Sequence, residues 1–203
     1  RRHLALAEAP DNPLTQPQSA RFESVIQGLP GARSIANSAG LIAWPQTRTD
    51  WVRPGLAIYG ASPLSRQSAL SLGLKPAMKL ESRLIAVREY AAGEAIGYGQ
   101  SYRCPERMRM GVASVGYADG VHRSLPSGTA ALVSGARVSY AGRVSMDMIT
   151  LDLRAVPNAR VGDAVLLWGE GLPAEEIAAC AVTIVYELFC GLTQRVQFLH
   201  INS

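Results

Sequence analysis

Lysine is almost absent from this chain. Among its 203 residues only Lys75 and Lys79 are lysines, so most of the 20 basic side chains are arginines, and these are scattered singly. Nucleic acid would need a Lys/Arg-rich patch with interleaved aromatic residues, which the sequence lacks. With 16 acidic residues, the formal net charge is only +4. The composition therefore argues against a nucleic-acid partner.

Cysteine is also sparse, and long apolar runs are missing. Cys104, Cys180 and Cys190 are odd in number, widely spaced and without a CxxC pair, which argues against a disulfide framework and a metal site. We therefore expect reduced thiols, a cytoplasmic location and no bound metal. No apolar stretch approaches the roughly 18 residues of a membrane span, and the first residues lack the apolar core of a secretion signal. We expect no membrane partner.

The first part of the chain alternates short apolar strands with helices. The hydrophobic periodicity predicts strands at 3–7, 34–36 and 51–53, and helices at 16–27 and 38–44. Such alternation is typical of parallel β/α units, and three strands would be only part of a larger barrel or open sheet. Because the first residue is arginine and a strand follows at once, we expect a piece of a longer polypeptide, which lacks an N-terminal segment.

The second part consists of β runs divided by glycine turns, after helix-stop signals at residues 62–75. Strands are predicted at 77–89, 110–115, 130–133, 137–140, 148–153, 164–167 and 195–201. One helix, from 172 to about 181, carries a proline and acidic residues in its first turn. The predicted fold class is α/β plus all-β, with the last strands and helices of a β/α (TIM-type) barrel in residues 1–72. A mostly antiparallel β domain would occupy residues 73–203.

Two loops of the first part have the composition of an anion site. Ser38, in Asn37-Ser38-Ala39, can donate a hydrogen bond directly after a strand, and Arg53 ends the next strand. Gly55 would let a phosphate approach the backbone closely. Each loop alone is more typical of a turn or a helix cap. Together, on consecutive strands, they predict a phosphate site.

Tyr98 is a candidate proton acceptor because it stands between Gly97 and Gly99. The bared backbone should let its phenol project into a cavity, whereas most tyrosines are half-buried rings with a satisfied hydroxyl. A phenol accepts a proton near neutral pH only where cationic neighbours stabilise the phenolate. Arg123 and Arg143 are candidates from their motif positions, although an exposed ion pair is the more ordinary role of either.

Six motifs occur along the chain in a fixed order. They are Asn37-Ser38-Ala39; Val52-Arg53-Pro54-Gly55-Leu56 with Tyr59-Gly60; Gly97-Tyr98-Gly99 with Tyr102; Gly116-Tyr117-Ala118-Asp119-Gly120; Gly142-Arg143 with Met146-Asp147; and Tyr186-Glu187-Leu188 followed by Arg195-Val196. In order and spacing they resemble the C-terminal part of bacterial alanine racemase. The resemblance covers nearly the whole chain, and six ordered motifs are specific where one would be weak.

The resemblance implies a pyridoxal 5'-phosphate enzyme that interconverts L- and D-alanine, with a β/α barrel followed by a β domain. It also implies a head-to-tail homodimer whose active sites draw on both subunits. Tyr98 would be the base on one face of the substrate α-carbon, and the cofactor lysine would serve the other face. Arg53 would face the pyridine nitrogen.

The same resemblance assigns binding roles to further residues. Those implied to contact the cofactor are His3, Asn37, Ser38, Arg53, Gly55, Leu56 and Tyr186. Met146, from the other subunit, and Tyr117 would contact the substrate. The entrance would be lined by Tyr117, Glu8, Arg123 and Arg143.

The chain departs from the family at the lysine. The family's cofactor lysine lies in an N-terminal motif on the first barrel strand, and nothing around Lys75 or Lys79 resembles that motif. We therefore expect this chain to be inactive alone. Two alternatives stay open, a non-catalytic β domain for dimerisation or binding, and a related pyridoxal-phosphate amino-acid racemase or decarboxylase. Enzymes that supply D-alanine for the cell wall and enzymes that consume it share these motifs.

Overall fold

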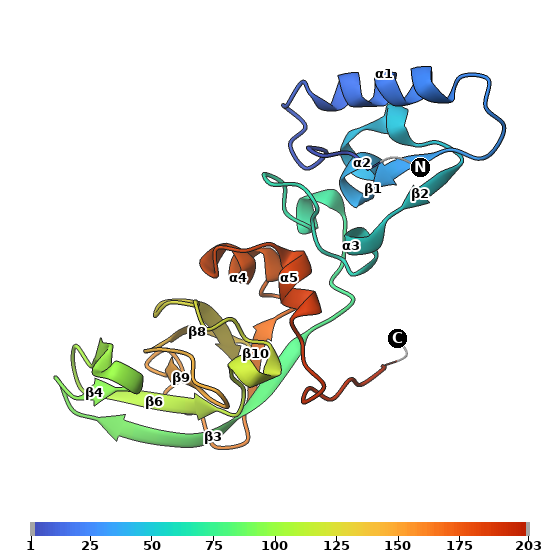
Figure 1. The fold of residues 1–203 in the computed structure, drawn as a ribbon. Helices are drawn as coiled ribbons and strands as arrows, with labels where there is room; N and C mark the ends of the chain where they lie inside the picture. The colour runs from blue at the N-terminus through green and yellow to red at the C-terminus, as the bar shows by residue number, and fades with distance from the viewer. Residues whose placement is uncertain (1–2, 202–203) are drawn as a thin grey trace. The chain divides into compact units, whose positions relative to one another are not determined.

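A computed structural model describes residues 3–201, and the chain divides into two compact units between Met78 and Lys79 (Figure 1). The sequence alone places this boundary after residue 72. The first unit combines helices with parallel strands, and the second is dominated by antiparallel strands.

The first unit is built around two short parallel strands. Its elements are α1 (Thr15–Ile26), β1 (Ser34–Asn37), α2 (Ser38–Ala43), β2 (Trp51–Arg53) and α3 (Gly55–Ile58), with 3-10 turns at Pro45–Thr47 and Leu70–Leu72. Ser34 lies opposite Trp51 and Asn37 opposite Arg53, so β1 and β2 end together. The buried residues of its core are Leu4, Ala7, Ile35, Ala39, Trp44 and Leu64. Both strands therefore deliver their carboxyl ends to one edge, where the predicted anion loops follow.

The predicted strand at 3–7 is wrong. Residues 3–7 are irregular, and in the described part of the chain β1 pairs only with β2, so no neighbouring strand offers a hydrogen-bonding ladder there. Other side chains hold this segment instead: Gln18 Oε1 accepts from the amide of Ala5 at 3.1 Å, and the indole of Trp44 donates to the Ala7 carbonyl at 3.1 Å. The segment is apolar because Leu4 and Ala7 are buried in the core, although it forms no strand.

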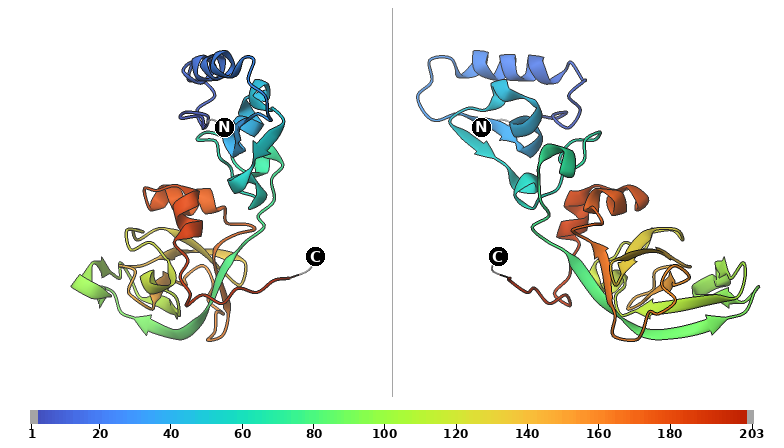
Figure 2. Two further views of the ribbon diagram at one scale, coloured as in Figure 1. Left: turned by 45° about the vertical axis from the view of Figure 1, so that its right-hand side comes forward. Right: turned by 180° about the vertical axis from the view of Figure 1, so that it is seen from behind.

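The second unit is a closed antiparallel barrel with the strand order β10-β3-β6-β9-β8-β7 (Figure 2). Its strands are β3 (Leu80–Tyr90), β6 (Met108–Ala113), β7 (Ala130–Val133), β8 (Ala136–Tyr140), β9 (Ile149–Asp152) and β10 (Ala164–Trp168). The long strand β3 curves around the barrel and pairs with both β6 and β10. Leu84, Val133, Ile149, Leu151 and Val165 fill the interior, each at most 1% exposed. Closure leaves no unpaired barrel edge.

Smaller elements surround this barrel. A two-stranded hairpin pairs β4 (Ala95–Ile96) with β5 (Tyr102–Arg103), and 3-10 turns lie at Tyr98–Gln100 and Tyr117–Asp119. Helices α4 (Ala174–Cys180) and α5 (Val185–Cys190) lie side by side, and the rings of Trp168 in β10 and Phe189 in α5 are 5.1 Å apart. Sequence reasoning predicted α4 and missed α5.

The predicted strand at 195–201 is also wrong. This segment is irregular and lies outside every named sheet of the described residues. Its apolar side chains are exposed, with Phe198 58%, Leu199 75% and Ile201 84% accessible. The closed barrel leaves no edge for another strand to join, and Arg195 contacts two carboxylates instead.

Residues 3–201 contain neither a membrane-spanning helix nor a cluster of metal-ligating side chains. No helix there is both long and apolar enough to cross a membrane. No group of three or more histidine, cysteine or acidic residues in that range could hold a metal ion.

Cys104, Cys180 and Cys190 are free thiols, and Cys104 is buried. Burial raises the pKa of the Cys104 thiol above its ordinary value.

Candidate functional site

The beginnings of α2 and α3 lie together in the first unit. Asn37 ends β1 and caps α2, because its Oδ1 accepts a hydrogen bond from the amide of Gly40 at 2.9 Å. Ser38 follows, only 1% exposed, and its Oγ accepts from the amide of Ala57 in α3 at 3.2 Å. Since this bond uses the oxygen as an acceptor, the hydroxyl proton of Ser38 stays free to be donated.

Arg53 and Gly55 complete this edge. The Arg53 guanidinium donates to the Ser34 hydroxyl and, at 3.3 Å, to the Ile35 carbonyl, so it lies along β1. A side chain at Gly55 would meet no atom within 4 Å, which leaves the space above the first turn of α3 open. Leu56 is buried beneath, at 4% exposure. The structure thus brings the two predicted anion loops together.

Three further predicted residues, His3, Glu8 and Tyr186, belong to neither of these two loops. His3 and Glu8 are exposed, and the Glu8 carbonyl accepts from the amide and the hydroxyl of Ser65, each at 3.2 Å. Tyr186 lies in α5 of the second unit and is 42% exposed.

Tyr98 opens a 3-10 turn, and the glycines on either side of this tyrosine have positive φ angles, +73° at Gly97 and +69° at Gly99. These left-handed conformations favour glycine. The Tyr98 ring is 73% exposed, so it does not pack inside a hydrophobic core. A Cβ at Gly99 would lie 3.4 Å from Nη1 of Arg143. The guanidinium of Arg143 therefore lies against the turn that presents the phenol.

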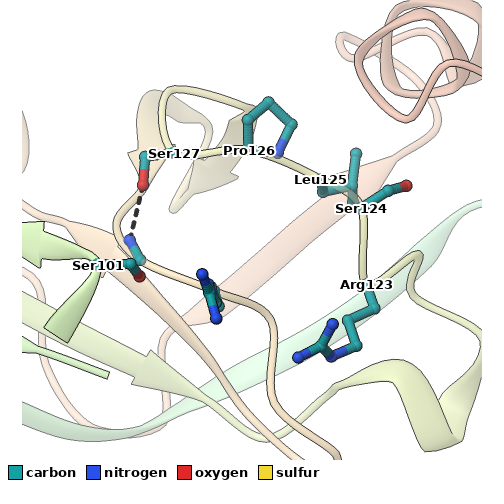
Figure 3. Close-up of a pocket in the computed structure, with 8 residues that line it drawn as sticks. Ser101, Arg123, Ser124, Leu125, Pro126 and Ser127 are labelled. Carbon is teal, nitrogen blue, oxygen red and sulfur yellow. Dashed lines mark hydrogen bonds between the residues drawn. The ribbon is translucent and has the colours of Figure 1, made fainter. Parts of the chain in front are cut away.

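Arg123 and Arg143 share a cavity of about 460 Å³ in the second unit (Figure 3). Three serines also line it: Ser101, Ser124 and Ser127. The amide of Gly142 donates to Ser127 Oγ at 2.9 Å and closes one wall. The structure thus places two arginines that the motifs singled out at one opening, and one of them adjoins the Tyr98 turn.

Tyr117 and Met146 belong to two segments joined through their main chains. The amide of Tyr117 donates to the Ser145 carbonyl, and the amide of Ala118 donates to the Met146 carbonyl, both at 3.0 Å. A Cβ at Gly116 would lie 2.3 Å from the Ser145 oxygen, so only glycine allows this approach. Tyr117 is 40% and Met146 51% exposed. Two predicted substrate contacts therefore project from segments that are hydrogen-bonded to each other.

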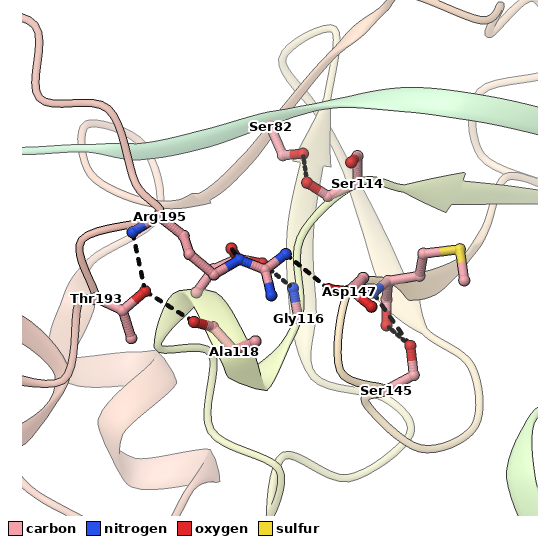
Figure 4. Close-up of polar contacts among 10 residues, drawn as sticks. Ser82, Ser114, Gly116, Ala118, Ser145, Asp147, Thr193 and Arg195 are labelled. Carbon is pink, nitrogen blue, oxygen red and sulfur yellow. Dashed lines mark hydrogen bonds and ion pairs between the residues drawn. The ribbon is translucent and has the colours of Figure 1, made fainter.

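Sequence reasoning missed the ion pairs behind these segments (Figure 4). Arg195 contacts Asp119 Oδ1 through Nε at 3.1 Å and Asp147 Oδ1 through Nη2 at 2.6 Å. The hydrogen bond to Asp147 raises the pKa of Arg195 above its ordinary value. All three residues lie inside recognised motifs, but no local pattern predicts a contact across 48 positions of sequence.

Both parts of the chain match known families. Residues 2–63 match the model of the alanine racemase N-terminal domain, and residues 77–200 match that of the alanine racemase C-terminal domain. The alanine racemases of Shewanella amazonensis and Shewanella frigidimarina are each 50% identical over 194 residues, which cover 96% of this chain. They cover 53% and 52% of those relatives, so the chain spans about half their length.

Solved structures agree in fold. The biosynthetic alanine racemase of Pseudomonas aeruginosa superposes with a TM-score of 0.93 at 46% identity, over 98% of this chain and 56% of that one. The alanine racemase of Bartonella henselae, with covalently bound pyridoxal phosphate, gives a TM-score of 0.88 at 31% identity, over 98% of this chain and 55% of that one.

These matches confirm the predicted fold class, the end of an α/β barrel domain followed by an antiparallel β domain. The chain belongs to the alanine racemase family.

Proposed function

We propose that the complete enzyme containing this chain interconverts L- and D-alanine in the cytoplasm as a homodimer that uses pyridoxal 5'-phosphate. The main support for this proposal is that relatives with 50% identity over 96% of the chain are alanine racemases. The motifs that support the proposal lie in ordered turns and helix starts of the structure. The alternative of a purely structural β domain leaves the paired anion loops of the first unit without a role.

The residues at the starts of α2 and α3 fit the phosphate of this cofactor. The buried Ser38 has a hydroxyl proton to donate, and the open space at Gly55 would admit a phosphate oxygen close to the backbone. Asn37, Leu56, Tyr186 and His3 complete the proposed binding set. When bound, pyridoxal phosphate acts as an electron sink for the carbanion formed at the substrate α-carbon.

Arg53 has a distinct proposed role beside the pyridine nitrogen. A guanidinium has only donors and stays charged, so it would donate a hydrogen bond to this nitrogen without transferring a proton. The contacts of Arg53 with Ser34 and Ile35 hold the guanidinium along β1 and support a fixed orientation.

Tyr98 is the proposed base. Its phenolic oxygen would take the proton from one face of the substrate α-carbon and return one in the reverse direction, while the lysine of the N-terminal half serves the other face. The guanidinium of Arg143 lies against the turn that carries Tyr98, which places a fixed positive charge beside the proposed base. Met146, from the other subunit, and Tyr117 would contact the substrate, and Tyr117, Arg123, Arg143 and Glu8 would line the approach to it.

The test is Tyr98→Phe in the complete enzyme. Loss of a general base should lower kcat by about 10²- to 10⁴-fold while pyridoxal phosphate stays bound. In deuterium oxide, exchange of the α-hydrogen should be lost from one alanine enantiomer and retained by the other, which the lysine serves. Unchanged turnover in both directions, or equal loss of exchange from both enantiomers, would refute the assignment.

A further inference from the structure

Three segments that are distant in sequence meet at the side chain of Arg195 (Figure 4). They are residues 116–120, which contain Tyr117; residues 145–148, which contain Met146; and residues 193–196. Arg195 forms ionic contacts with both other segments, through Nε to Asp119 at 3.1 Å and through Nη2 to Asp147 at 2.6 Å. The guanidinium thus links the Tyr117 turn to the loop at residues 145–148 through side chains, in addition to the main-chain hydrogen bonds between them.

The two carboxylates differ in their surroundings. The side chain of Asp119 is only 13% exposed and also accepts from the amide of Gly116 at 2.8 Å, which closes the Tyr117 turn. The side chain of Asp147 is 52% exposed. With the guanidinium in place, one positive charge lies between two negative ones. Without it, the turn and the loop would face each other with uncompensated like charges, and like charges repel most strongly where one is shielded from water.

A second set of contacts fixes Arg195 itself. Thr193 Oγ1 donates to the Ala118 carbonyl at 2.7 Å, and the Thr193 amide donates to the Asp119 carbonyl at 3.3 Å. The Arg195 amide in turn donates to Thr193 Oγ1 at 3.3 Å. The segment is therefore anchored to the turn before the arginine extends to Asp147.

The turn and the loop are otherwise joined by two backbone bonds, from Tyr117 to Ser145 and from Ala118 to Met146. The four residues they join are exposed or half-buried, and because such bonds replace bonds to water, two of them add little net stability. Side chains that contact a substrate must be held more firmly than this, because a displacement of about 1 Å can reduce the rate about 10²-fold.

We propose that Arg195 is a positioning residue that fixes Tyr117 and Met146 relative to each other for substrate binding. The substrate part of this proposal rests on the proposed function. Lysine could not replace the arginine fully, since a single ammonium group lacks the planar fork that reaches two carboxylates at once.

The experiment compares Arg195→Ala, Arg195→Lys and Asp147→Asn in the complete enzyme. Arg137→Ala is the matched control, because it removes an exposed guanidinium from Glu176, between β8 and α4 and away from both segments. The first readout is hydrogen exchange at the amides of Tyr117 and Ala118. The second is the separation of KM and kcat for both alanine enantiomers, with cofactor occupancy followed by absorbance.

Arg195→Ala should accelerate exchange at the two amides and raise KM in both directions, with kcat/KM lowered about 10- to 100-fold and cofactor occupancy unchanged. Arg195→Lys should restore part of this loss, and Arg137→Ala should change neither readout. Exchange in Arg195→Ala no faster than in Arg137→Ala would overturn the proposal, as would accelerated exchange with wild-type KM. A wild-type enzyme without racemase activity would instead refute the proposed function and, with it, the role of Arg195 in substrate binding.

Discussion

The hydroxyl of Tyr140 offers a direct test of the packing in the β barrel. Tyr140 ends β8 at 2% exposure, and its main chain is fully paired, with its amide donating to Thr129 at 2.7 Å and its carbonyl accepting from Gly128 at 2.9 Å. Among the described residues, however, the buried Oη has no hydrogen-bond partner. Tyr140→Phe removes this oxygen and leaves the ring in place.

The magnitude follows from two opposing effects. An unsatisfied buried hydroxyl costs about 1–3 kcal/mol, which the substitution recovers. The vacated space of roughly 15 Å³ costs about 0.4 kcal/mol, at about 24 cal/mol per Å³ of cavity. We therefore expect the free energy of unfolding to rise by about 0.6–2.6 kcal/mol, measured by equilibrium denaturation with an unchanged m-value. Tyr90→Phe, at a half-buried position at the end of β3, should change it little.

The pH dependence provides a second readout. Burial raises the pKa of Tyr140 above its ordinary value, so above the unfolded pKa of about 10 the folded state retains a proton that the unfolded chain has lost. Stability from this group is complete below that pH and falls as the pH rises further, by up to about 1.4 kcal/mol per pH unit. Tyr140→Phe should remove this component of the slope. A variant less stable than wild type by 1 kcal/mol or more, with the same alkaline slope, would refute the reasoning.

Two other substitutions test the local geometry. Gly116→Ala would place a methyl group 2.3 Å from the Ser145 oxygen, so it should separate the Tyr117 turn from the neighbouring loop and lower kcat/KM more than tenfold in the complete enzyme; wild-type kinetics would contradict this close approach. Asn37→Ala removes the cap of α2 and should lower the free energy of unfolding by about 1 kcal/mol, whereas Asn37→Asp should retain most of it. Equal losses in the two variants would show that the cap contributes nothing.

The antiparallel unit could be predicted well from sequence because alternation and glycine turns determine it locally. The strand at 130–133 was predicted with the observed bounds, as was the strand at 51–53 in the first unit. The wrong strands at 3–7 and 195–201 are apolar runs, and whether such a run becomes a strand depends on whether a partner edge exists, which is a property of the whole fold. Helix α5 was missed because Val185-Tyr186 and Phe189 favour strands by intrinsic propensity.

Site residues could be predicted from the sequence where a motif lies at the end of a strand. Ser38 follows β1 and Arg53 ends β2, and since parallel strands end at one edge, their proximity followed from chain order. The contacts of Arg195 did not, because a lone arginine followed by Val196 carries no signal of its partners. Only the folded barrel brings its segment to Asp119 and Asp147.

The bonds between the Tyr117 turn and the Ser145–Met148 loop run from main chain to main chain, so they do not depend on which side chain stands at position 146. Because peptide groups set the register, the residue at 146 can be exchanged during evolution without moving the frame that carries it. If Met146 contacts the substrate, as proposed, a substitution there would alter that contact and leave these bonds in place, whereas any side chain at position 116 would meet the Ser145 oxygen.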